Sequence, residues 1–188
     1  MKTFNGFLTE AKRPKGAVFT FGRFNPPTTG HAKLVKQLQK VAKGFDVLLF
    51  TSHSNDRRKN PLTHKQKISY LRKFFGKIVV DSTVRTVFDV ANQLQQQKYT
   101  HVRMVVGSDR IREFETLLNK YNGVKARHGF YKFESIEVVS AGERDPDADD
   151  VSGMSASKLR GYAEQGDFDN FKVGVPSKNA SDIQRLYK

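Results

Sequence analysis

The residues with the clearest potential for chemistry lie in one segment, Gly22-Arg23-Phe24-Asn25-Pro26-Pro27-Thr28-Thr29-Gly30-His31. Its two prolines restrict the backbone, and Gly30 allows the main chain to approach a ligand closely. A helix that begins here would present its first N–H groups to an anion, and His31 in the first turn could point an imidazole N–H at the same group. The pattern predicts a phosphate site, although a helical histidine beside an ordinary loop is an alternative.

Two further segments contain groups that suit a nucleotide. In Ser152-Gly153-Met154-Ser155-Ala156-Ser157-Lys158-Leu159-Arg160, the serines open a helix and Arg160 lies on the same side as Ser157, three residues earlier. A simple serine cap of the helix is the other interpretation. The segment Gly107-Ser108-Asp109-Arg110 follows a strand directly, where Asp109 could bind a nucleotide or cap the next helix.

Alternating apolar strands and amphipathic helices place these segments. Five strands are expected, at 17–21, 45–50, 77–80, 102–106 and 136–139. Helices are expected at 31–42, 63–75, 87–97 and 111–121, followed by two C-terminal helices at 155–164 and 177–187. The order predicts an α/β, Rossmann-like, doubly wound, five-stranded parallel sheet, with ligands bound at the carboxyl ends of the strands.

Composition narrows the class of protein. The chain has 188 residues, no cysteine and no apolar run of membrane-spanning length, so one domain without disulfides or a thiolate nucleophile is expected. The net charge of +14 attracts nucleotides and nucleic acids alike. We expect a domain over residues 17–188 and an N-terminal tail or targeting peptide over residues 1–16. No residue is assigned to a metal, and the acidic run 145–150 is interpreted as a solvated loop.

The first segment resembles a known family. Thr28-Thr29-Gly30-His31 is similar to the (H/T)-x-G-H motif of cytidylyltransferase-like nucleotidyltransferases, and the preceding Gly-Arg-Phe-x-Pro is similar to the nicotinamide mononucleotide adenylyltransferases among them. The Ser152–Arg160 segment resembles the triphosphate-binding motif of the family. The resemblance implies nucleotide contacts at Gly22, Arg23, Phe24, Gly30, Gly107, Asp109, Ser155 and Ser157.

The resemblance also implies a reaction. A phosphorylated acceptor would attack the α-phosphorus of a nucleoside triphosphate and release pyrophosphate, with Mg²⁺ and cationic side chains balancing the charge. His31 would stabilise the α-phosphate, Thr28 would contact phosphate, and Arg160 with Ser155 would hold the β and γ phosphates. ATP with nicotinamide mononucleotide is the favoured pair of substrates. CTP, for making a CDP-activated alcohol, is the alternative.

A binding role without turnover is a third hypothesis. Eight cations form a basic run that could bind an acceptor phosphate or nucleic acid: Arg57, Arg58, Lys59, Lys65, Lys67, Arg72, Lys73 and Lys77. Residues 1–11 resemble the capsid-targeting peptide of packaged proteins in tailed phages, with Leu8-Thr9-Glu10 before Ala11 as the cleavage site. The expected location is the cytoplasm of a host cell, or the inside of a phage capsid.

Overall fold

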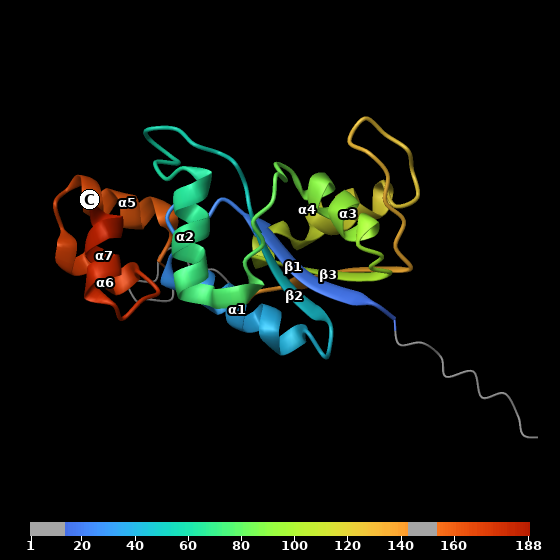
Figure 1. Cartoon of the computed structure of the whole chain (residues 1–188), viewed down its shortest axis with the longest axis horizontal. Helices are drawn as coiled ribbons and strands as arrows, with labels where there is room; N and C mark the ends of the chain where they lie inside the picture. Colours follow the sequence, from blue (N-terminus) through green and yellow to red (C-terminus); the bar gives the residue numbers. More distant parts are fainter. Residues whose placement is uncertain (1–13, 143–153) are drawn as a thin grey trace, which may run out of the picture.

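A computed structural model describes residues 14–142 and 154–188, which form a parallel sheet with helices on both sides (Figure 1). The strands are β1 (Gly16–Gly22), β2 (Asp46–Thr51), β3 (His101–Val106) and β4 (Ser135–Ser140). The helices are α1 (Thr29–Val41), α2 (His64–Phe75), α3 (Val87–Gln96), α4 (Ile111–Lys120), α5 (Ala156–Glu164), α6 (Phe168–Gly174) and α7 (Ala180–Tyr187), with the short 3₁₀ helices η1 (Gly76–Ile78) and η2 (Ser108–Arg110). None of the described helices has the length and apolar character needed to cross a membrane.

The sheet is doubly wound, as the sequence predicts. Its order is β2-β1-β3-β4, and every neighbouring pair is parallel. Side chains alternate between its faces, so Phe19 packs with α3 and α4 while Val18 packs with α1 and α2. Both faces are therefore covered by helices, and the carboxyl ends of β1, β3 and β4 meet along one edge.

The predicted fifth strand is not a strand of this sheet. The segment 77–80 contains η1 and a single parallel bridge between Leu49 and Val79, with one hydrogen bond from the N–H of Val80 to the carbonyl of Leu49 at 2.9 Å. Gly76, with φ of 73°, turns the chain just before this point, and Asp81 follows the apolar residues. Only two extended residues remain for pairing, which is too few to form a strand, so the described sheet has four strands.

The C-terminal helices form a small cluster of their own. The predicted helix at 155–164 is confirmed, the one predicted at 177–187 begins at Ala180, and α6 between them was missed. Leu159, Phe171 and Leu186 make an apolar core that also packs against α2. Figure 1 shows α5, α6 and α7 gathered at one end of the molecule beside α2. The expected targeting peptide, its cleavage site and the acidic run 145–150 lie outside the described residues.

Three helices of the domain begin in the same way. Thr28, Thr63 and Thr86 are the N-caps of α1, α2 and α3, and each makes a capping box with the residue three positions later. The third residue is a glutamine in α2 and an aspartate in α3, which are ordinary partners for a cap. In α1 it is His31, so the residue predicted to do chemistry is also the one that closes the cap.

Candidate functional site

The loop between β1 and α1 has a constrained backbone. Phe24 has φ of 47°, in the left-handed region that residues with a side chain seldom adopt, and the Asn25–Pro26 peptide bond is cis. The Phe24 ring is buried, and a Cβ added at Gly22 would lie 3.0 Å from it. Gly22 therefore makes room for the ring that shapes the loop. Such strained backbone is common at functional sites.

Three distant segments hold this loop in place. The Asn25 amide donates to the carbonyl of Leu62 and accepts from its N–H, both at 3.0 Å. The Thr51 hydroxyl at the end of β2 donates to the carbonyl of Arg23 at 3.2 Å. The Arg160 guanidinium in α5 donates to the carbonyl of Asn25 at 2.7 Å. The loop is thus joined to β2, to the approach to α2 and to the C-terminal helices.

The capping box fixes the imidazole of His31. The Thr28 N–H donates to Nδ1 of His31 at 2.9 Å, and the His31 N–H donates to the Thr28 hydroxyl at 3.3 Å. Because a backbone N–H can only donate, Nδ1 must accept, and the neutral ring carries its proton on Nε2. The Phe24 ring packs on the imidazole with centroids 4.7 Å apart. His31 can therefore present an Nε2–H donor to a phosphate oxygen.

A cavity of about 230 Å³ opens at the carboxyl ends of the strands, next to this histidine. It brings together seven of the residues that the sequence assigns to the site: Gly22, Phe24, Thr28, Gly30, His31, Gly107 and Asp109. Sequence reasoning missed other residues of its lining, including Lys33 and Arg110, because a helical lysine and an arginine after a turn carry no distinctive spacing. Asp109 is the one carboxylate among the described residues that line it.

The residues predicted in α5 lie outside this cavity. Ser155 caps α5 by accepting from the N–H of Lys158 at 3.1 Å, and Ser157 accepts from the Arg160 guanidinium at 3.1 Å. Arg160 lines a second cavity, so the side-chain contacts of this motif support the loop and the helix start. Arg23 is exposed and lines neither cavity.

The starts of α1 and α5 nevertheless lie against each other. A Cβ at Gly30 would come 2.8 Å from the carbonyl oxygen of Met154, and Met154 itself lines the first cavity. This close approach requires a residue without a side chain at position 30. Two helix N-termini therefore converge near the cavity, and both favour negative charge.

Thr28 has a different place from the one expected. It is buried, and its hydroxyl takes part in the cap with His31. Its side chain therefore positions the imidazole, and a direct contact with phosphate remains a prediction. At the end of β3, a Cβ on Gly107 would lie 2.6 Å from a carboxylate oxygen of Asp109, so Asp109 folds back over this backbone.

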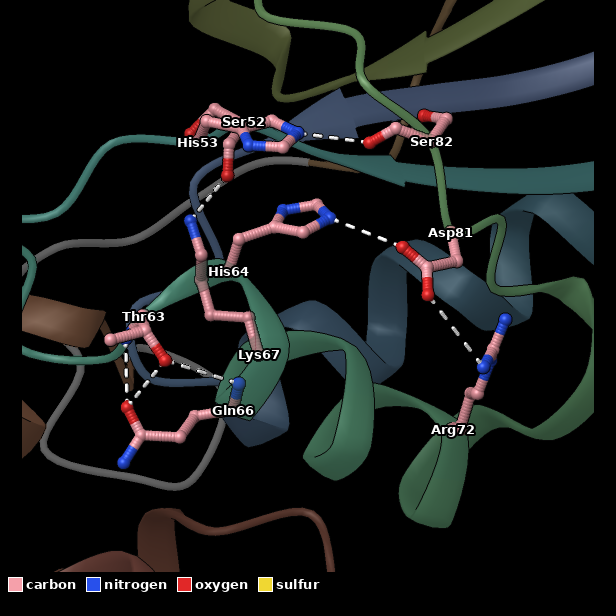
Figure 2. A network of polar contacts seen from close by, with 9 residues as sticks. All are labelled: Ser52, His53, Thr63, His64, Gln66, Lys67, Arg72, Asp81 and Ser82. Carbon is pink, nitrogen blue, oxygen red and sulfur yellow. Dashed lines mark hydrogen bonds and ion pairs between the residues drawn. The ribbon is translucent and has the colours of Figure 1, made fainter.

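A polar network that sequence reasoning missed lies behind the loop after β2 (Figure 2). Lys67 is fully buried, and its ammonium donates to the carbonyls of Ser52 and Ser54, the latter at 3.3 Å. Burial lowers the pKa of Lys67 to about 8. Lys67 was predicted as part of the basic run, and this assignment is wrong. Its helical position faces the core, where backbone carbonyls receive the charge.

Two stacked histidines continue this network. The rings of His53 and His64 lie 3.7 Å apart and nearly parallel, at 10°. His53 Nε2 lies 2.9 Å from the carbonyl of Ser82, and His64 Nε2 lies 3.4 Å from a carboxylate oxygen of Asp81 (Figure 2). The stack joins the end of β2 to the start of α2 and to the segment after η1. It gives the loop between β2 and α2 a fixed base.

The fold and site together define a class of protein: an α/β domain with a nucleotide-sized cavity at the carboxyl edge of a parallel sheet and a histidine fixed at a helix N-terminus. The family model described as Cytidylyltransferase-like matches residues 19–161. The chain therefore belongs to the cytidylyltransferase-like family of nucleotidyltransferases. This family implies a nucleoside triphosphate as substrate.

Solved structures with the same fold include two of Plasmodium falciparum nicotinic acid mononucleotide adenylyltransferase. The complex with NaAD has a TM-score of 0.58 at 12% identity, and the match covers 92% of this chain and 94% of the other. The complex with APC has a TM-score of 0.55 at 14% identity, with 92% and 97% covered. At this identity the likeness concerns the fold. A search of curated protein sequences finds no match.

Proposed function

We propose that this chain moves AMP from ATP to a phosphorylated acceptor, nicotinamide mononucleotide, and releases pyrophosphate. The observation that supports this most is the fixed imidazole of His31. The cap with Thr28 determines its tautomer and direction at the start of α1, beside the first cavity. A donor already oriented for a phosphate needs no rearrangement during the reaction.

The reaction would be an in-line displacement at the α-phosphorus. A phosphate oxygen of the acceptor forms the new O–P bond, and the bond from the α-phosphorus to the bridging oxygen breaks. The bridging oxygen keeps the electron pair and leaves with pyrophosphate. His31 donates from Nε2 to an oxygen of the α-phosphate, and the N–H groups at the start of α1 add to the positive potential. Thr28 and Arg160 act as positioning residues through the loop contacts described above.

Mg²⁺ would neutralise charge on the β and γ phosphates. The described residues contain no group of three or more potential metal ligands among His, Cys, Asp and Glu. Mg²⁺ is commonly bound through one or two carboxylates together with substrate phosphates and water. We therefore expect Mg²⁺ to arrive on the triphosphate, with Asp109 as the carboxylate nearest to hand in the cavity lining.

The choice of acceptor depends on the sequence motifs. The Gly-Arg-Phe-x-Pro and Ser-Gly-Met elements resemble those of nicotinamide mononucleotide adenylyltransferases, and two structural neighbours carry nicotinic acid mononucleotide adenylyltransferase in their names. A cytidylyltransferase is the alternative within the same family. The nucleotide that raises the melting temperature, ATP or CTP, distinguishes the two because a ligand stabilises only the state that binds it.

The test is pyrophosphate release by the purified chain with Mg²⁺. We expect release with ATP and nicotinamide mononucleotide, and a loss of about a hundredfold or more in His31→Ala, because one oriented donor is removed. His101→Ala is the matched control, since His101 begins β3 at the opposite edge of the sheet. Full activity in His31→Ala would contradict the role of the imidazole. Activity with CTP and an alcohol phosphate would replace the adenylyl assignment.

A further inference from the structure

A second cavity, of about 410 Å³, lies between α2, the loop before it and the C-terminal helices. Its lining shares no residue with that of the first cavity. Its volume falls within the range of about 300–1,000 Å³ that small-molecule sites occupy. The transfer reaction proposed above makes no use of this space, so its own chemistry decides what it can hold.

The rim of this cavity carries unbalanced positive charge. Arg57, Arg58, Arg185 and Lys188 line it and are exposed, and none of their side chains forms an ion pair with another described residue. Glu164 is the one carboxylate side chain among the described lining residues. Like charges gathered in this way repel one another, and a bound anion relieves the repulsion. The rim therefore points to a ligand with negative charge.

The wall of the cavity is aromatic. Tyr70 and Tyr187 line it and are half-buried, and Phe171 and Leu186 form the apolar floor. The rings of Phe171 and Tyr187 meet edge to face with centroids 5.0 Å apart, which holds Tyr187 in place. An inorganic anion would gain nothing from these surfaces. A flat aromatic group would gain stacking and burial, at about 1–3 kcal/mol for each base in known single-strand sites.

We propose that the second cavity binds a nucleobase that carries a phosphate, with the base against Tyr70 and Tyr187 and the phosphate on Arg57 and Arg185. A free nucleotide and one unit of a single-stranded nucleic acid share this chemistry. The net charge of +14 gives both an attractive field over the whole molecule. The site is independent of the proposed transfer, because Arg57, Arg185 and the two tyrosines lie outside the first cavity.

The test is fluorescence anisotropy with a labelled single-stranded oligothymidylate, at one fixed salt concentration. Arg185→Ala should weaken binding about tenfold, because a charged contact to phosphate is lost. Arg112→Ala is the charge-matched control, since Arg112 is exposed on α4 and lines neither cavity. Tyr70→Leu keeps an apolar side chain but removes the ring, and it should also weaken binding several-fold.

Unlabelled competitors identify the source of the ligand. Displacement by thymidine monophosphate assigns the site to free nucleotides, and displacement only by unlabelled oligonucleotide assigns it to a strand. Equal weakening in Arg185→Ala and Arg112→Ala would overturn the proposal, as would displacement by inorganic phosphate as strong as by the nucleotide. Unchanged binding in Tyr70→Leu with an unchanged melting temperature would overturn the stacking contact. Pyrophosphate release should stay at the level of the unmodified chain in Arg185→Ala, so failure of either proposal is seen separately.

Discussion

Replacing Lys67 by methionine isolates the cost of a buried charge. Methionine matches the length of the lysine stem but has no ammonium. In the native chain the ammonium is buried against the carbonyls of Ser52 and Ser54, with its pKa lowered from 10.5 to about 8 by desolvation. The variant removes both the charge and the two hydrogen bonds. Stability at a single pH therefore mixes two opposing effects, whereas the pH dependence reports the charge alone.

The sign and size of that pH dependence follow from the two pKa values. Between about pH 8 and 10.5 the unfolded chain holds a proton on Lys67 that the folded chain has released. The unfolded state binds more protons, so the free energy of unfolding rises with pH, by at most about 1.4 kcal/mol for each pH unit. From about pH 7 to about pH 9.5, the two titration curves give a rise of about 2 kcal/mol from this lysine.

Urea unfolding at both pH values measures this rise. We expect it in the native chain and in Lys65→Met, which removes an exposed lysine from the same helix. In Lys67→Met the rise should be smaller by about 2 kcal/mol. Other titrating groups cancel because they are common to all three proteins. An identical pH dependence in Lys67→Met and the control would refute the buried-charge argument.

Two further predictions concern a close contact and an ion pair. Gly30→Ala places a Cβ 2.8 Å from the carbonyl of Met154, so thermal unfolding should show a loss of about 1–3 kcal/mol; Gly161→Ala in α5 has open space and should gain up to about 1 kcal/mol. The hydrogen bonds from Arg103 lower the pKa of Glu137, so its contribution to stability is complete above the ordinary pKa and is lost as the pH falls through the folded value. Glu137→Gln should therefore lose less stability on acidification in urea unfolding, and an unchanged acid dependence would contradict this assignment.

The doubly wound fold could be predicted because each buried strand has a continuous apolar run and each helix has one apolar face. Phe19 and Val18 are both apolar because the two faces of β1 are covered. The segment around Val79 has the same apolar character over a shorter length. Periodicity does not tell a paired strand from an extended residue that makes one bridge, so the fifth strand was overpredicted.

The first cavity was also largely predictable, because its residues come from two strand ends and one helix start. The second cavity and the position of Arg160 were not. Arg160 meets Asn25 across 135 positions of the sequence, and this contact depends on how α5 to α7 pack against α2. The burial of Lys67 depends on the carbonyls that surround it, and the sequence of a helix says nothing about those.

The contact between Arg160 and Asn25 bears on the order in which the protein can mature during translation. The loop that holds His31 is made early, but its carbonyl at Asn25 and the neighbour of Gly30 are supplied by Arg160 and Met154, far later in the chain. A nascent chain with its sheet already assembled would still have an unfinished site. Nucleotide binding should therefore begin only after α5 has left the ribosome and docked.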